Sequence, residues 1–176
     1  MPILKTAKPA PIYMTPACAL RLRAELKEIL YKLRPEMANT AAWAASNGDR
    51  SENADYHYAK KKLRQYDGRI RFLSKRLENA TIVDPVEQEK IAHGKAFFGA
   101  TVTVETAEGE EKVFSIVGAD EFDISRGYVS WVSPVGRALL GSAEGDVVSF
   151  ATPGGRTELE IIKVEYKALD KEAVRE

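Results

Sequence analysis

Hydrophobic residues in the first half of the chain recur at steps of three and four, the spacing of one face of an α-helix. A helix can start at Thr15-Pro16, a capping residue followed by proline. The first run of apolar and small positions comprises Leu22, Leu26, Leu30, Leu33, Met37, Thr40 and Ala44. Pro35 interrupts the run and predicts a kink or a local break. The pattern stops at Ser46-Asn47-Gly48, which is a turn signal.

A second run repeats the same spacing more regularly over three heptads. It comprises Tyr56, Ala59, Leu63, Tyr66, Ile70, Leu73 and Leu77. Two such helices joined by a short polar turn form an antiparallel hairpin. Ordinary helices packed on a globular core would also show apolar stripes, but these stripes are narrow and flanked by charge, which favours a coiled coil. About 30 residues per arm predict a rod of roughly 45 Å.

After Asp84-Pro85 the period changes from that of a helix to that of a strand. Short strands are predicted at Ala100–Thr106, Lys112–Val117, Tyr128–Val132, Val147–Ala151 and Arg156–Tyr166. The last strand changes phase after Ile161, which predicts a β-bulge. Ser133-Pro134 begins a short helix that Gly141 ends. The fold class is therefore α+β, a coiled-coil hairpin followed by a small antiparallel β domain with one short helix.

The same patterns give the expected domain boundaries. In chain order they are an N-terminal extension at 1–13, the hairpin at 14–84 with its tip at 48–55, a polar linker at 85–94, the β domain at 95–167 and a charged tail at 168–176.

The composition mainly excludes certain kinds of site and of protein. The 176 residues are 44% hydrophobic and 30% charged with a net charge of zero, which is typical of a globular protein. Cys18 is the only cysteine, and His57 and His93 are isolated, so no zinc site is predicted. The chain shows neither a secretory signal nor an apolar run of about 20 residues. A cytoplasmic protein is expected.

Two carboxylates, Asp49 and Glu52, lie three residues apart beside the predicted turn. In one interpretation they form a capping box at the start of the second arm, where the positive end of the helix dipole also favours acids. In the other they are part of a Mg²⁺ site, which another molecule would complete. From these residues alone, capping is the more economical interpretation.

Basic residues dominate the second arm, where Asp67 is the one acid between positions 60 and 76. They are Lys60, Lys61, Lys62, Arg64, Arg69, Arg71, Lys75 and Arg76. Glu25, Glu28 and Glu36 on the first arm can pair with a few of them. The remainder favours contact with a phosphate backbone over a merely solvated face.

In the predicted β domain, Ser130-Trp131-Val132-Ser133-Pro134 ends a strand with an aromatic residue and a proline. Such a segment can form a docking patch on the surface. Trp131 is equally well explained as a core residue.

These motifs resemble the bacterial Gre transcript-cleavage factors, the GreB branch more closely than the GreA branch. The resemblance spans about Thr15 to Tyr166. It is carried by the tip motif Gly48-Asp49-Arg50-Ser51-Glu52-Asn53-Ala54-Asp55-Tyr56 and by 43–46, 60–64, 82–84, 97–100, 116–118, 133–134 and 137–140.

The resemblance implies that the coiled coil enters the secondary channel of bacterial RNA polymerase, while an FKBP-like β domain docks at the channel rim. Asp49 and Glu52 would help to hold a second Mg²⁺ at the active centre of the polymerase, so that backtracked RNA is cut by hydrolysis. The polymerase would hold most of the metal ligands, and the free protein, expected to be a monomer that binds no membrane, would hold no metal. It would be an accessory factor rather than an enzyme.

The resemblance also implies roles for other residues. Ser51, Asn53 and Asp55 would support the tip, and the basic residues of the second arm would guide the extruded RNA. Ser130, Val132, Ser133 and Pro134 would dock on the polymerase.

Several departures and rival functions remain open at this point. Close relatives carry a polar residue, often aspartate, where this chain has Val132, and the 85–93 linker is longer here. A channel-binding regulator that competes with cleavage factors would share the architecture but alter the tip. A free-standing nuclease would need more metal ligands than this chain supplies. A prolyl isomerase would need an aromatic-lined pocket, which the sequence does not predict.

Overall fold

The computed structural model describes residues 11–47 and 53–169, and these divide into two compact units. One unit is Ala19–Asn79. The other combines the described residues up to Cys18 with those from Ala80 onward. The predicted tip residues Asp49, Ser51 and Glu52 lie outside the described residues.

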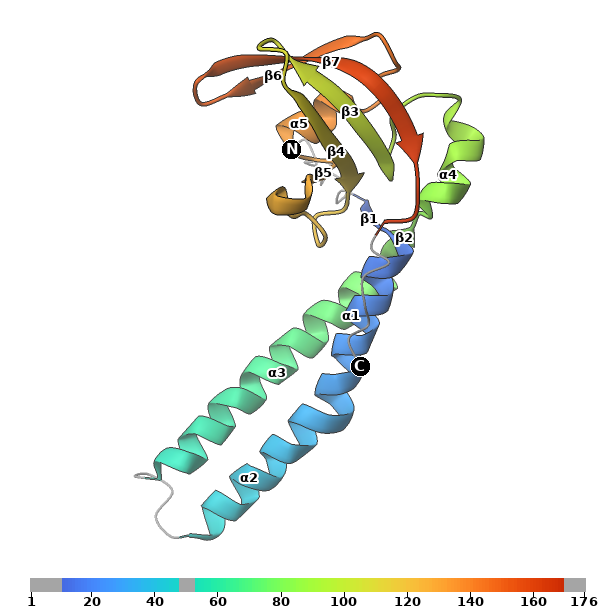
Figure 1. Cartoon of the computed structure of the whole chain (residues 1–176). Helices are drawn as coiled ribbons and strands as arrows, with labels where there is room; N and C mark the ends of the chain where they lie inside the picture. Colours follow the sequence, from blue (N-terminus) through green and yellow to red (C-terminus); the bar gives the residue numbers. More distant parts are fainter. Residues whose placement is uncertain (1–10, 48–52, 170–176) are drawn as a thin grey trace, which may run out of the picture. The chain divides into compact units, whose positions relative to one another are not determined.

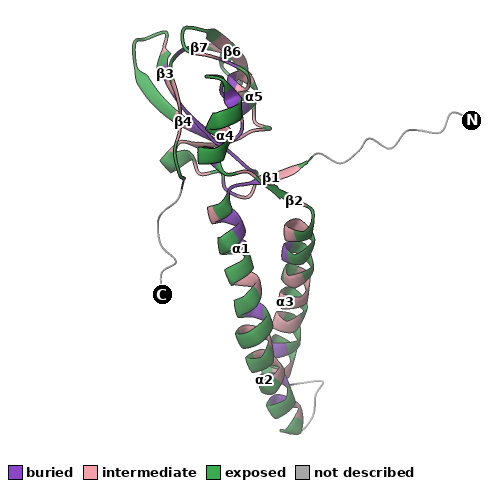
Figure 2. Cartoon of the chain, turned by 90° about the vertical axis from the view of Figure 1, so that its right-hand side faces the viewer, coloured by how far each residue is buried: buried purple, intermediate pink, exposed green. Residues whose placement is uncertain are grey.

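The first unit is a helical hairpin (Figure 1). One arm consists of α1 (Pro16–Glu28), a π-helical segment (Ile29–Leu33) and α2 (Arg34–Ser46), and the other arm is α3 (Ala54–Glu78). Every position of the predicted stripe on α3 is buried or half-buried, with Ala59 and Leu73 fully covered. Most other positions are exposed (Figure 2). The predicted coiled-coil hairpin is confirmed.

The π-helical segment is the local break that Pro35 predicts. Proline has no N–H for the α-helical hydrogen bond, and a wider turn just before it accommodates that loss. On this arm Ile29, three residues after Leu26, is buried, and Leu30 is 38% exposed. Farther along, Ala41 is buried and Thr40 is exposed. The sequence prediction was therefore wrong for Leu30 and Thr40.

The second unit contains a five-stranded sheet in the order β5-β4-β3-β7-β6. The strands are β3 (Ala100–Thr106), β4 (Glu111–Val117), β5 (Tyr128–Ser130), β6 (Val147–Thr152) and β7 (Gly155–Tyr166). Neighbours pair antiparallel except β4 and β5, which are parallel. Thr103 pairs with Lys163 and Val104 with Ile161, so Ile162 is the extra residue of the predicted bulge.

The core of this unit lies between the sheet and α5 (Pro134–Leu139). Alternate residues of β3, Val102 and Val104, are fully buried with Ile116 of β4 and Leu139 of α5. Ser133 caps α5 by accepting a hydrogen bond from the Gly136 N–H. The period-two pattern and the Ser-Pro start signal thus predicted this part correctly.

Two short strands were not predicted. β1 (Ile12–Met14) pairs in parallel with β2 (Ala80–Ile82), and the Val83 N–H donates to the Met14 carbonyl oxygen at 2.9 Å. Residues 12–13, assigned to an extension, therefore belong to the fold. The hairpin unit begins at Ala19 and ends at Asn79, inside the predicted 14–84 boundary.

A buried carboxylate fastens β1 and the start of α1 to the β unit. Glu121, only 6% exposed, accepts hydrogen bonds from the Thr15 N–H (3.0 Å), the Thr15 hydroxyl and the Gly118 N–H (3.2 Å). The Thr15 Oγ1 in turn accepts from the Cys18 N–H and so caps α1.

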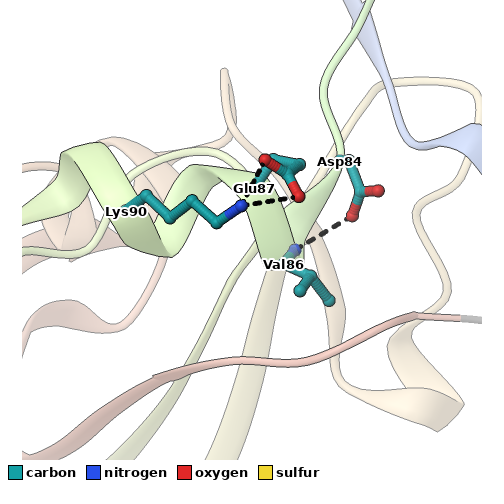
Figure 3. A network of polar contacts seen from close by, with 4 residues as sticks. All are labelled: Asp84, Val86, Glu87 and Lys90. Atoms are coloured by element: carbon teal, nitrogen blue, oxygen red, sulfur yellow. Dashed lines mark hydrogen bonds and ion pairs between the residues drawn. The ribbon is translucent and has the colours of Figure 1, made fainter.

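The segment predicted as a linker forms a helix, α4 (Pro85–Ala92), in the part of the chain that follows β2. Asp84 caps it by accepting from the Val86 N–H at 3.0 Å, and Glu87 pairs with Lys90 one turn later (Figure 3). Asp84-Pro85 is the same start signal as Thr15-Pro16. The polar composition of the segment obscured that signal.

Candidate functional site at the free end of the hairpin

The two arms are joined by hydrogen bonds where they approach the tip. The carbonyl oxygen of Ala44, near the end of α2, accepts from the Asn47 N–H at 3.2 Å and from the Asn53 Nδ2 at 2.6 Å. Asn53 also accepts with its Oδ1 from the Tyr56 N–H at 3.0 Å. One side chain therefore contacts both arms.

Asn53 is the N-cap of α3, since the helix begins at Ala54 and Asn53 has extended backbone angles. Asn is among the best N-cap residues. The capping-box interpretation, which placed Asp49 at the N-cap of this helix, is therefore wrong. Asp49, Ser51 and Glu52 lie outside the described residues, and their metal and support roles stay predictions. Asp55 is exposed in the first turn of α3, where an acid is favoured.

Basic side chains cover the outer face of α3, but the structure divides them into two groups. Five of the eight are exposed and form no ion pair with any described residue: Lys60, Lys61, Arg64, Arg71 and Lys75. The other three, Lys62, Arg69 and Arg76, contact partners on the hairpin. The predicted stripe is thus not uniform, and Lys60, Lys61 and Arg64 are its exposed residues nearest the tip.

Ion pairs between described residues join the arms. Arg69 contacts Glu25 at 2.6 Å, as the sequence allowed, and this hydrogen bond lowers the pKa of the Glu25 carboxyl. Arg34 contacts Asp67 at 2.6 Å, which lowers the pKa of Asp67. Because all four side chains are over one-third exposed, these pairs set the register of the arms more than they stabilise them.

Aromatic rings of α3 also contact basic groups by cation–π interactions, which the sequence analysis did not predict. The guanidinium groups of Arg69 and Arg76 lie 5.2 and 5.6 Å from the centre of the Phe72 ring, and Lys62 lies 6.0 Å from that of Tyr66. The i, i+3 and i, i+4 spacings of these residues could have indicated the contacts.

The predicted docking segment at the end of β5 is partly core. Trp131 is half-buried, packs on the core cluster and meets the Tyr13 ring edge-on at 5.2 Å. Trp131 therefore takes part in the packing of the β unit, and the docking role of the segment stays a prediction. Val132, 37% exposed, and Pro134 present their side chains at the surface, while Ser130 and Ser133 are half-buried.

The shape of this segment depends on a close approach at Gly136. A Cβ added there would lie 2.1 Å from the Ser130 carbonyl oxygen, which is backbone and cannot move alone. We expect Gly136→Ala to lower the free energy of unfolding by about 2–3 kcal/mol, as forced overpacking does. Denaturant unfolding measures it, with Gly154→Ala as the control because nothing lies within 4 Å of that position. Equal stability of the two variants would contradict the close approach.

The β unit also has an apolar pocket of about 370 Å³, lined in part by the aromatic rings of Tyr13, Phe97, Phe98 and Trp131. The sequence did not predict this aromatic-lined pocket, so the expectation that the chain lacks one was wrong. Tyr13 is the titratable residue among those that line it, and a fold with a pocket carries no activity by itself.

Within residues 11–47 and 53–169, no group of three or more possible metal ligands lies together. The same residues include no helix that is long and apolar enough to cross a membrane.

Comparison with known proteins identifies the family of the chain. The family model described as "Transcription elongation factor, N-terminal" matches residues 12–82, and "Transcription elongation factor, GreA/GreB, C-term" matches 91–166. A GreB of Neisseria meningitidis serogroup A is 49% identical over 90% of this chain and 96% of its own length. A Yersinia pestis GreB is 44% identical over 86% of both chains. A solved Nitrosomonas europaea GreA/GreB factor shares 25% identity, covers 88% of this chain and 99% of its own, and gives a TM-score of 0.39. The chain therefore belongs to the GreA/GreB family of transcription elongation factors.

Proposed function

We propose that this elongation factor inserts its hairpin into the secondary channel of bacterial RNA polymerase and stimulates Mg²⁺-dependent cleavage of backtracked RNA. The observation that most supports the proposal is that Asn53 caps α3. The carboxylates of Asp49 and Glu52 are then not needed for that cap. They can act on a partner instead, and the protein acts in the cytoplasm as an accessory factor rather than as an enzyme.

The donor set at the tip fits a shared metal site. Two carboxylates supply part of the oxygen ligands that Mg²⁺ takes, and this ion commonly completes its shell with water, phosphate and a partner's carboxylates. The described residues hold no complete ligand group of their own. When bound between polymerase and factor, the ion would lower the pKa of a water and offset charge on the attacked phosphate. Asp49 and Glu52 would position it there.

The tip-proximal basic residues would act on the RNA itself. Lys60, Lys61 and Arg64 lie within the first three turns of α3, a few residues beyond the tip motif. Their exposed charges would attract the phosphates of an extruded RNA 3′ segment without reading its sequence. At the other unit, Val132 and Pro134 would contact the rim of the channel, with apolar contact replacing the polar contact made in relatives.

A stalled, backtracked elongation complex tests the proposal. Purified polymerase is halted with its RNA 3′ end extruded, and the factor and Mg²⁺ are added. We expect release of short 3′ RNA fragments and resumption of elongation. If the factor binds and blocks cleavage instead, the protein is a competing regulator. If it cuts free RNA without polymerase, it is an enzyme and the accessory role is wrong.

A triple variant tests the role of the tip-proximal cations; it combines Lys60→Gln, Lys61→Gln and Arg64→Gln. It should act more weakly than the wild type on long extruded RNA. Each lost phosphate contact lowers the slope of log affinity against log salt by about 0.7 for a single strand. We expect a higher factor concentration for half-maximal cleavage and a flatter salt dependence.

The control removes the same charge from exposed lysines of the β unit, with Lys95→Gln, Lys112→Gln and Lys167→Gln combined. If both triple variants raise the factor concentration for half-maximal cleavage equally, the total charge of the protein matters and the tip-proximal group has no special role.

A further inference from the structure

Asn53 makes hydrogen bonds in two directions, and only one of them is a helix cap. Its Oδ1 accepts from the Tyr56 N–H of α3, while its Nδ2 donates across to the Ala44 carbonyl oxygen of α2 at 2.6 Å. The backbone carbonyl of Asn53 also accepts from the His57 N–H at 3.1 Å. The side chain is thus fixed at both of its polar atoms.

The Ala44 carbonyl oxygen accepts two hydrogen bonds. Ala44 is fully buried, and its carbonyl oxygen accepts from the Asn47 N–H as well as from the Asn53 amide. A carbonyl oxygen has two lone pairs and can accept both bonds. The last described residue before the tip and the first one after it, Asn47 and Asn53, are therefore bound to one atom of α2.

Capping alone does not require asparagine at this position. Asp and Ser are equally good N-cap residues, because the cap needs only a side-chain acceptor. Among short side chains that carry such an acceptor, the asparagine amide also supplies N–H donors that reach across to another backbone. The cross-arm bond is the part of the arrangement that Asp and Ser cannot make.

We propose that Asn53 is a positioning residue for the tip: by bonding to Ala44 it holds the two ends of the tip segment at a fixed separation. This inference rests on the proposed function, in which Asp49 and Glu52 act together on one ion. Fixing the ends before the factor meets its partner lowers the ordering cost of bringing those carboxylates into place. Asn53 itself touches neither metal nor RNA.

Two variants separate the cross-arm bond from the cap. Asn53→Asp is nearly isosteric and keeps the acceptor for the Tyr56 N–H, but it puts an oxygen against the Ala44 carbonyl. Asn53→Ser keeps a cap without adding charge and is too short to reach Ala44. Both keep a cap and should therefore retain the helix content of the wild type, which circular dichroism measures.

Cleavage in the backtracked complex is then measured over a range of factor and Mg²⁺ concentrations. We expect both variants to lower the rate at saturating factor by about tenfold, a typical effect of losing a group that orients metal ligands. The factor concentration for half-maximal cleavage should stay within about twofold, and the Mg²⁺ requirement should rise. A merely structural role would not lower the rate at saturating factor while leaving the factor concentration for half-maximal cleavage nearly unchanged.

Asn79 supplies a matched control at the other end of α3. Its Nδ2 donates to the Lys75 carbonyl oxygen at 2.9 Å, and that oxygen also accepts from the Asn79 N–H. Asn79→Asp removes a bond of the same kind within a single arm, so the rate at saturation should not change.

The outcomes distinguish the two proposals. If the wild-type factor releases no RNA fragments, the proposed function is wrong. If the wild type cleaves and Asn53→Ser cleaves equally fast at saturation, the positioning role is overturned. A loss confined to Asn53→Asp also overturns it, because the added charge then explains the effect.

Discussion

Replacing Asp49 by asparagine and Glu52 by glutamine together is expected to lower factor-stimulated RNA cleavage by at least about 100-fold. The amides keep the size of the side chains but remove the charges that would hold Mg²⁺. The start of α3 should be unaffected because Asn53 caps it. The rate at saturating factor measures the first effect, and circular dichroism with thermal unfolding measures the second.

The matching control removes two exposed acids elsewhere on the hairpin, with Glu36→Gln and Glu78→Gln combined. That variant changes the net charge equally and should cleave like the wild type. Full cleavage by the tip variant would exclude a metal role for its carboxylates. A large loss of helix in the tip variant would instead show that they maintain the structure.

Removing the Glu121 carboxylate, in Glu121→Ala, is expected to lower the free energy of unfolding of the β unit by about 3 kcal/mol. The change leaves buried donors without their acceptor, among them the Thr15 and Gly118 N–H groups. It also opens a cavity beneath β1. Because Thr15 caps α1, the first turn of that helix should lose protection as well. Denaturant unfolding and amide hydrogen exchange measure the two effects.

Glu110→Ala, which changes an exposed carboxylate in the β3–β4 turn, is the control and should stay within about 0.5 kcal/mol of the wild type. Comparable stability of the two variants would mean that water replaces the lost acceptor and that Glu121 is not the fastening point.

Long periodic segments of this chain could be predicted from sequence because each position repeats the same evidence. Seven residues at steps of three and four predict the same buried face of α3. Along β7, the alternation of apolar and polar residues changes phase after Ile161, which predicts the bulge at Ile162. Prediction fails where the period allows two neighbouring positions. After Leu26, steps of three and four allow either Ile29 or Leu30 to face the second arm, and the structure buries Ile29.

Short elements and competing caps could not be predicted for a different reason. Strands of three residues, such as β1, are too short to show alternation, and their pairing with β2 is a long-range contact. At the tip, Asp49, Ser51 and Asn53 are all good capping residues, so the pattern alone could not choose among them. In the structure Asn53 is the cap, and its amide also bonds to Ala44 across the hairpin.

The pairing of β1 with β2 makes the helical hairpin an insertion within the β unit. The β unit consists of two stretches of chain. The hairpin, Ala19–Asn79, connects them and is inserted between the paired strands β1 and β2. A folded hairpin brings its own ends together, which reduces the entropy cost of joining these strands. Changes in the length of the arms or in the residues of the tip therefore need not disturb the β unit. The same β unit is accordingly compatible with inserted hairpins of different length and tip sequence.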